Sequence, residues 1–141
     1  MIIKQLSVFL ENRSGRLHEV FDILGNSNIN VSACSVADTT DFGILRMIVS
    51  EPDKARQILK DQMFSVNVSE VISFAPPTTP GALRKTLKIL SDAGIGIEYL
   101  YGFSPGDKSF IVLRSDNIEQ AIAELQRHEM ELISASELYK F

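Results

Sequence analysis

The sequence predicts an α+β fold made of two tandem copies of one β-α-β-β-α-β unit with antiparallel sheets. Three observations predict it. The chain aligns with itself, without a gap, at an offset of 66 residues. Apolar residues alternate in some short segments, as in strands, and recur every three or four residues in others, as in helices. The 141 residues, 45% of them hydrophobic, are enough for two small packed domains.

The self-alignment pairs apolar residues and glycines along the whole chain. Examples are Leu6 with Ile72, Val8 with Phe74, Gly15 with Gly81, Leu17 with Leu83, Ile29 with Ile95, Ala55 with Ala121 and Leu59 with Leu125. Such agreement over many positions indicates a duplication. We therefore expect two domains, residues 1–69 and 70–141. In each domain both helices are expected on one side of an antiparallel sheet, which is the ferredoxin-like arrangement.

The elements of the first copy follow from periodicity and from turn residues. Strands are expected at residues 4–10, 29–33, 42–49 and 64–68, and helices at residues 17–24 and 52–59. Ser14 is the expected N-cap of the first helix, and Pro52 suits the first turn of the second. Thr39, Thr40 and Asp41 form the expected turn between the two middle strands.

The second copy repeats this order. Residues 65–74 contain neither Gly nor Pro, so the last strand of the first copy is expected to run directly into the first strand of the second. Helices are expected at residues 83–90 and 118–125, and further strands at 96–103, 109–114 and 130–138. Asp116 and Glu119 have the spacing of a capping box.

Charge and cysteine content exclude several function classes. The net charge is −4 and no block of Lys or Arg is present, which disfavours nucleic acid as a partner. No segment has the length and hydrophobicity of a membrane span or the pattern of a signal peptide. The single Cys34 cannot form an internal disulfide and is expected to be buried. A cytoplasmic location is therefore predicted.

The loop before the first helix carries the residues best suited to binding. A helix N-terminus presents N–H groups and a partial positive charge, and Gly15 allows an anion to approach the backbone. Arg13 and Arg16 add positive potential, although both are also compatible with solvated surface charges. Asn12 can donate and accept hydrogen bonds, and Asn30 opens the second strand, which we expect beside this loop.

Both loops resemble the signature of the ACT domain family, whose members are small regulatory modules that usually sense amino acids. That signature is an Asn or Asp, then Pro-Gly-x-Leu, a helix, and Gly-(Ile/Val)-Asn-(Ile/Val). The first copy matches at Asn12–Leu17 and Ile29–Val31, with Ser14 in place of Pro and Asn28 in place of Gly. The second copy matches at Pro80–Leu83, but has Thr78 and Gly96 where Asn is usual.

The resemblance implies a ligand site at an interface between two such units. In the first copy it implicates Asn12, Arg13, Ser14, Gly15, Arg16, Leu17 and Asn30, and Leu10, which precedes the loop, is also expected at the ligand. In the second copy the matching positions are Pro76, Thr78, Thr79, Gly81 and Leu83. Because Gly96 offers no side chain, we expect the first copy to be the better binder.

The leading hypothesis is therefore a tandem ACT protein that binds a free amino acid at a domain interface and acts as a regulatory sensor. Its partners would be the amino acid and either a second copy, as a homodimer, or another protein. The alternatives are an interaction module that binds no ligand and an RNA-binding ferredoxin-like protein. No residues form a base, nucleophile and oxyanion donor, and neither His18 nor His128 has metal-ligand spacing. We expect no enzyme activity, catalytic residue, metal or cofactor.

Overall fold

The computed structural model describes residues 1–11, 13–38 and 41–140, and it contains two compact units. The first-repeat unit consists of Lys4–Ser69 with the chain end from Leu138. The second-repeat unit consists of Met1–Ile3 and Glu70–Glu137. Each unit thus includes one repeat and a short segment from the opposite end of the chain. In the first-repeat unit the backbone N–H of Lys4 donates to the Tyr139 hydroxyl at 3.1 Å, which holds the C-terminal segment in place.

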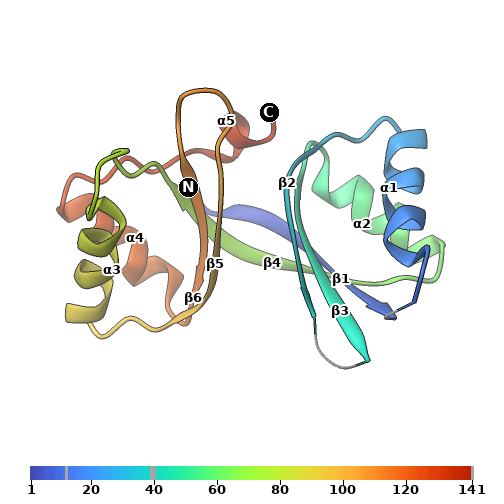
Figure 1. The fold of residues 1–141 in the computed structure, drawn as a ribbon, viewed down its shortest axis with the longest axis horizontal. Coiled ribbons are helices and arrows are strands. Elements are labelled where there is room, and N and C mark those ends of the chain that lie inside the picture. The colour runs from blue at the N-terminus through green and yellow to red at the C-terminus, as the bar shows by residue number, and fades with distance from the viewer. Residues whose placement is uncertain (12, 39–40, 141) are drawn as a thin grey trace. The chain divides into compact units, whose positions relative to one another are not determined.

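The first repeat has the predicted order of elements. These are β1 (Ile3–Glu11), α1 (Arg16–Asn26), β2 (Val31–Asp38), β3 (Phe42–Val49), α2 (Pro52–Asp61) and β4 (Ser65–Phe74), all labelled in Figure 1. Pro52 lies in the first turn of α2, as predicted. The turn expected at Thr39 and Thr40 lies outside the described residues.

The strands of the first repeat follow the order β2-β3-β1-β4. Strand β3 pairs antiparallel with both of its neighbours, so that Gly43 lies opposite Leu10 of β1 and opposite Asp38 of β2. At the other end of β3, Val49 lies opposite Val31. The last residues of β1 and β2 and the first residues of β3 therefore lie side by side at the same end of the strands.

Alternation along these strands builds the core of the first repeat. One cluster of buried residues joins two strands to both helices. It contains Leu6, Val8 and Leu10 of β1, Leu45, Met47 and Val49 of β3, Val20 and Leu24 of α1, and Ala55 and Leu59 of α2. Side chains of alternate strand residues point to the same face. Both helices therefore cover one face of this sheet, and they lie next to each other.

The second repeat reproduces the two helices and the first three strands of the first repeat in the same order. Its elements are α3 (Ala82–Asp92), β5 (Ile97–Phe103), β6 (Phe110–Ser115), α4 (Ile118–Arg127) and the short α5 (Ala135–Leu138), with strand order β4-β6-β5. Helices α3 and α4 begin and end 66 residues after α1 and α2. The core again joins strand residues such as Ile72 and Leu113 to Leu90 and Leu125 of the helices.

These elements confirm the predicted α+β fold with two βαββαβ-like units and antiparallel sheets. The single strand β4 confirms that the first copy runs into the second without a linker. The prediction of a last strand over residues 130–138 is wrong. Only Leu132 forms a bridge, to Phe74, and the chain then enters α5. Ser134 explains the change of direction, because its hydroxyl accepts the Glu137 N–H at 3.3 Å and so begins α5.

Two predicted helix caps are also wrong. The N-cap of α1 is Gly15, with φ of 91°, which has no side chain to cap this helix. The N-cap of α4 is Asn117, whose side chain accepts the Gln120 N–H at 3.1 Å. Asp116 instead accepts the N–H of Gly96 at 3.0 Å. Gly81, the N-cap of α3, repeats the Gly15 geometry with φ of 84°, so both loops enter their helices through a left-handed glycine.

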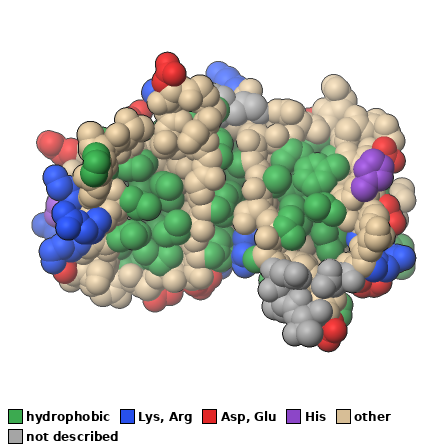
Figure 2. Space-filling model, in the orientation of Figure 1, with side chains coloured by type: hydrophobic (Ala, Val, Ile, Leu, Met, Phe, Trp, Pro, Cys, Tyr) green, Lys and Arg blue, Asp and Glu red, His purple; other side chains and the backbone are tan. Residues whose placement is uncertain are grey.

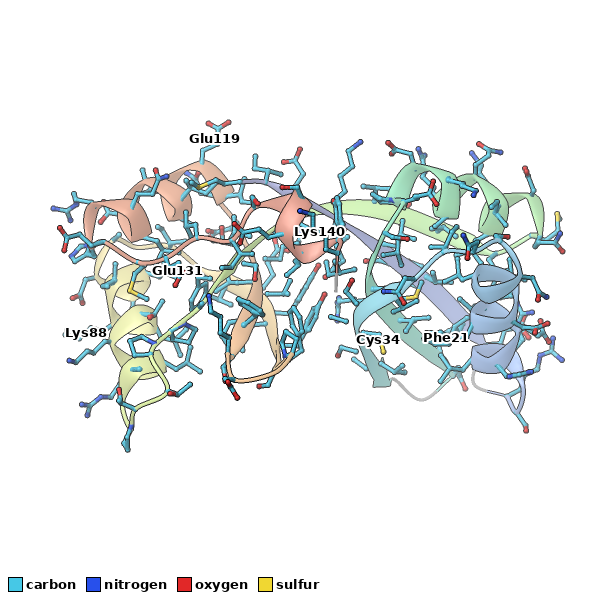
Figure 3. The ribbon with its side chains drawn as sticks, turned by 90° about the horizontal axis from the view of Figure 1, so that it is seen from above. Phe21, Cys34, Lys88, Glu119, Glu131 and Lys140 are labelled. Atoms are coloured by element: carbon cyan, nitrogen blue, oxygen red, sulfur yellow. The ribbon has the colours of Figure 1, made fainter. Side chains whose placement is uncertain are left out.

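Cys34 is exposed on β2 (Figure 3), so the prediction that it is buried is wrong. The reason is that β2 is an edge strand, which leaves part of its surface open. Among the described residues, no helix is both long and apolar enough to cross a membrane.

The two glycines of the α1 region should respond oppositely to alanine. Gly15→Ala places a Cβ at a positive φ, which should cost about 1–2 kcal/mol of stability. Gly25 lies inside α1 and is exposed, with open space where a Cβ would be, so Gly25→Ala should stabilise by about 0.5–1 kcal/mol. Urea denaturation of both variants checks this pair. Equal shifts in the same direction would contradict the helix boundary at residue 15.

Candidate functional site

A hollow of about 320 Å³ lies at the end of β1 in the first repeat. The residues that line it come from the strand ends and from the start of α1: Leu10, Glu11, Arg13, Arg16, Leu17, Val36 and Gly43. The pairing of Gly43 with Leu10 brings β1 and β3 together here, and β2 lies on the other side of β3. We call this hollow the β1-end pocket.

Four residues predicted from the sequence line this pocket, namely Leu10, Arg13, Arg16 and Leu17. Leu10 is buried, whereas the exposed fraction of Leu17 is 40%. Ser14 and Gly15 are exposed in the turn beside the pocket but do not line it. Asn12 lies outside the described residues. These four residues thus line one hollow, where Glu11 of β1, Val36 of β2 and Gly43 of β3 join them.

The two arginines of the loop have different surroundings. Arg13 is exposed and its Nε lies 3.2 Å from a carboxylate oxygen of Glu11. Arg16 is 18% exposed, with Nη1 at 2.7 Å from Glu19 and its guanidinium 4.3 Å from the centre of the Phe64 ring. The interpretation of Arg16 as a solvated charge is therefore wrong. Its Nε is buried and has no hydrogen-bond partner within the described part of the chain. Of the two, only Arg13 presents its charge to solvent at the rim.

Asn30 does not belong to this pocket in its own repeat. It precedes Val31, which pairs with Val49 at the far end of β3, whereas the pocket adjoins Gly43. Six residues of strand separate these ends, about 20 Å at roughly 3.4 Å per residue. The expectation that Asn30 lies beside the loop is wrong. Helix α1 runs back along the sheet, so β2 begins at the end of the strands where β1 starts, away from the loop. The backbone N–H of Asn30 donates to the Ser50 hydroxyl at 3.0 Å.

A second hollow, of about 270 Å³, lies at the matching place in the second repeat. Its lining includes Pro76, Pro77 and Ser109, which are the counterparts of Leu10, Glu11 and Gly43. The remaining lining residues are Ala75, Thr78, Asp107, Lys108 and Glu131. A hollow at the end of the first strand is therefore a feature of both repeats, with different side chains around it.

The other residues predicted for the second copy are divided among several places. Thr79 lines a smaller hollow of about 150 Å³ together with Pro77, Pro80 and Ala82. Gly81 is the N-cap of α3, and Leu83 packs against the core of the second repeat. The absence of a side chain at Gly96 is explained by Asp116, because a Cβ at Gly96 would lie 2.7 Å from Asp116 Oδ2. Of the residues predicted for the second copy, Pro76 and Thr78 line the second hollow.

A hollow larger than these, about 460 Å³, lies elsewhere, between α3 and α4. Its charged residues include Lys85, Lys88 and Arg127, and Figure 2 shows Lys and Arg side chains gathered at this end of the second repeat. Lys88 pairs with Asp92 at 3.2 Å and Arg127 with Glu124 at 2.9 Å. These pairs satisfy much of the charge within the groove, and nothing in the sequence motifs points to it. No described cluster of His, Cys, Asp and Glu could hold a metal ion.

Comparison with protein families identifies the chain. The family model described as an ACT domain pair matches residues 1–141. The chain belongs to the ACT domain pair family. This family consists of regulatory modules, so the resemblance noted in the two loops is confirmed over the whole length. No curated protein matches the chain.

Solved structures agree with this assignment. Protein BT0572 from Bacteroides thetaiotaomicron is 48% identical, with a TM-score of 0.95, and the match covers 100% of this chain and 98% of that one. The ligand-free regulatory subunit of aspartate kinase from Thermus thermophilus is 14% identical, with a TM-score of 0.66 and coverage of 88% and 91%. Aspartate kinase from Synechocystis is 20% identical, with a TM-score of 0.56, and the match covers 90% of this chain and 26% of the kinase. The last two likenesses concern the fold.

Alanine substitutions should separate the structural arginine from the solvent-facing one. Arg16→Ala removes a cation–π contact, an ion pair and a largely buried stem, and should cost about 1–2 kcal/mol of stability. Arg13→Ala removes an exposed ion pair and should cost less than about 0.5 kcal/mol. Chemical denaturation followed by circular dichroism measures both. A larger loss for Arg13→Ala would contradict the packing of Arg16 on Phe64.

Proposed function

We propose that this ACT domain pair binds a free amino acid in the β1-end pocket of its first repeat and thereby acts as a regulatory sensor. The observation that carries the proposal is the pocket itself, which has a counterpart in the second repeat. Three of its lining residues, Arg13, Arg16 and Leu17, belong to the loop that matches the ACT signature. Membership in a family of regulatory modules supports the regulatory role.

The rim of the pocket suits the head group of an amino acid. Arg13 and Glu11 present opposite charges 3.2 Å apart. A guanidinium forms two parallel hydrogen bonds with a carboxylate, and a carboxylate accepts from an ammonium. The N-terminus of α1, which begins at Arg16, adds about 0.3–1 kcal/mol for an anion placed near it. In this proposal Arg13 binds the ligand carboxylate and Glu11 its ammonium.

The affinity that a sensor needs is modest. Dissociation constants between about 10 μM and 1 mM correspond to roughly 4–7 kcal/mol of binding free energy. A charge-assisted hydrogen bond contributes about 1.5–3 kcal/mol. Two such contacts, together with burial of a small side chain, are sufficient for binding in that range.

Asn30 has a place in the proposal only if a second copy of the chain takes part. Its position at the far end of β3 separates it from the loop of its own repeat. In a homodimer, Asn30 of one copy would reach the β1-end pocket of the other, in line with the interface site that the ACT resemblance implies. Ligand binding would then favour the dimer, or a complex with a regulated protein in the cytoplasm, by its higher affinity for that state.

A thermal-shift screen of the twenty amino acids tests the proposal, with one substitution in each repeat. A Cβ at Gly43 would meet only ordinary contacts, with Ala37 O and Val36 Cγ1 at 3.8 Å, so Gly43→Val should fold while filling the pocket. Ligand at about 100 times its dissociation constant should stabilise the unsubstituted protein by about 2.7 kcal/mol. Gly43→Val should weaken binding at least tenfold, because its side chain occupies the ligand's place.

Ser109→Val is the matched control, because Ser109 is the counterpart of Gly43 in the second repeat. It should leave binding unchanged. If no amino acid stabilises the protein, the sensor proposal fails and an interaction module without a ligand becomes the better hypothesis. If binding survives Gly43→Val but not Ser109→Val, the ligand occupies the second repeat instead.

A further inference from the structure

We infer that the β1-end pocket selects amino acids with aliphatic side chains. This inference rests on the proposed function and concerns the part of the ligand that the head-group contacts leave undefined. It depends on the wall of the pocket, on the origin of its charged groups and on the contrast with the second repeat.

The wall of the pocket is aliphatic. Leu10, Leu17 and Val36 come from β1, α1 and β2, and Gly43 of β3 completes the lining without a side chain. Leu17 and Val36 are 40% and 51% exposed, which is high for large apolar residues. Burying apolar surface is favourable in proportion to the area removed from water. A ligand with an aliphatic side chain would cover both residues, and a small polar ligand would not.

All charged groups of the pocket are confined to its loop side. Glu11, Arg13 and Arg16 are the charged residues among its described lining, and they lie within a stretch of six residues. Arg16 is already engaged by Glu19 and Phe64. Glu11 and Arg13 are used by the ligand head group in the proposed function. A charged ligand side chain would therefore lie against leucine and valine without a partner, which is unfavourable.

The second repeat shows that this wall is not a general consequence of the fold. The counterpart of Val36 is Gly102, and the counterpart of Leu17 is Leu83, which packs against the core. The matching hollow has Thr78, Asp107, Lys108 and Glu131 around it instead. Because corresponding elements surround both hollows and their side chains differ, the aliphatic wall distinguishes the first repeat. We therefore expect aliphatic selectivity in the first repeat alone.

The size of the pocket agrees with a small ligand. Its volume of about 320 Å³ is near the lower limit of about 300 Å³ for small-molecule sites. One methylene more or less in an apolar pocket changes binding by about tenfold or more. Affinity should therefore rise from glycine through alanine to valine or leucine, and it should be low for aspartate and lysine.

Isothermal titration calorimetry of the full chain tests the inference with glycine, alanine, valine, leucine, aspartate and lysine. Valine or leucine should bind at least tenfold more tightly than the two charged amino acids. Val36→Thr replaces a methyl group by a hydroxyl of similar size on an exposed strand position. It should weaken leucine binding about threefold to tenfold and change glycine binding little. Leu17→Gln should act in the same direction.

Leu100→Gln, at an exposed leucine of β5 outside the hollows described above, is the control and should leave all affinities unchanged. Circular dichroism confirms that each variant is folded. Equal or tighter binding of aspartate or lysine, abolished by Gly43→Val, would overturn the inference while leaving the proposed function intact. Leucine binding that is insensitive to both Val36→Thr and Gly43→Val would also overturn it. If none of the six amino acids binds, the proposed function fails with it.

Discussion

The candidate site depends on the register between β1 and β3. Leu10 lies opposite Gly43, and the same glycine lies opposite Asp38 of β2, so three strand ends meet at the edge where α1 begins. A slip of one residue would turn Leu10 away from the helices and place a side chain where Gly43 now leaves space. The buried alternation of Leu6, Val8 and Leu10 against both helices prevents such a slip. Core packing and pocket geometry are therefore set by the same residues.

The duplication has kept backbone conformations and changed side chains. Residues with positive φ recur at matching positions: Gly15 with Gly81, Asn28 with Gly94, and Met63 with Glu129. The hydrogen bonds that end the helices recur as well, such as Ile29 N–H to Leu24 O and Ile95 N–H to Leu90 O, both 2.9 Å. Around the pocket, by contrast, Arg13 corresponds to Thr79 and Val36 to Gly102. One scaffold thus carries two hollows of different chemistry, and a ligand can distinguish them.

Periodicity and the internal repeat were enough to predict the fold, both helix pairs and the continuous strand β4, because these follow from local alternation and from core formation. The loop residues of the pocket could be predicted from the glycine and the arginines before the first helix and from the resemblance to the ACT signature. Val36 and Gly43 could not be predicted as pocket residues, since strand pairing brings them to the site. The expected turn between β2 and β3 was the one signal that could have placed Gly43 near the end of β1. Asn30 lies far from the pocket because β2 runs toward the pocket and Asn30 precedes its first residue. The predictions that Ser14 caps α1 and that Cys34 is buried were wrong, because helix capping and the exposure of an edge strand depend on tertiary structure.

The most direct test of the account is an NMR titration of the ¹⁵N-labelled full chain with leucine. Backbone amide shifts of Leu10, Arg13, Leu17 and Gly43 should change together along one saturating curve, because these residues surround a single pocket. The amides of Thr78 and Ser109, around the matching hollow, should not follow that curve. Saturable changes confined to the second repeat, or to the groove between α3 and α4, would contradict a ligand site at the end of β1.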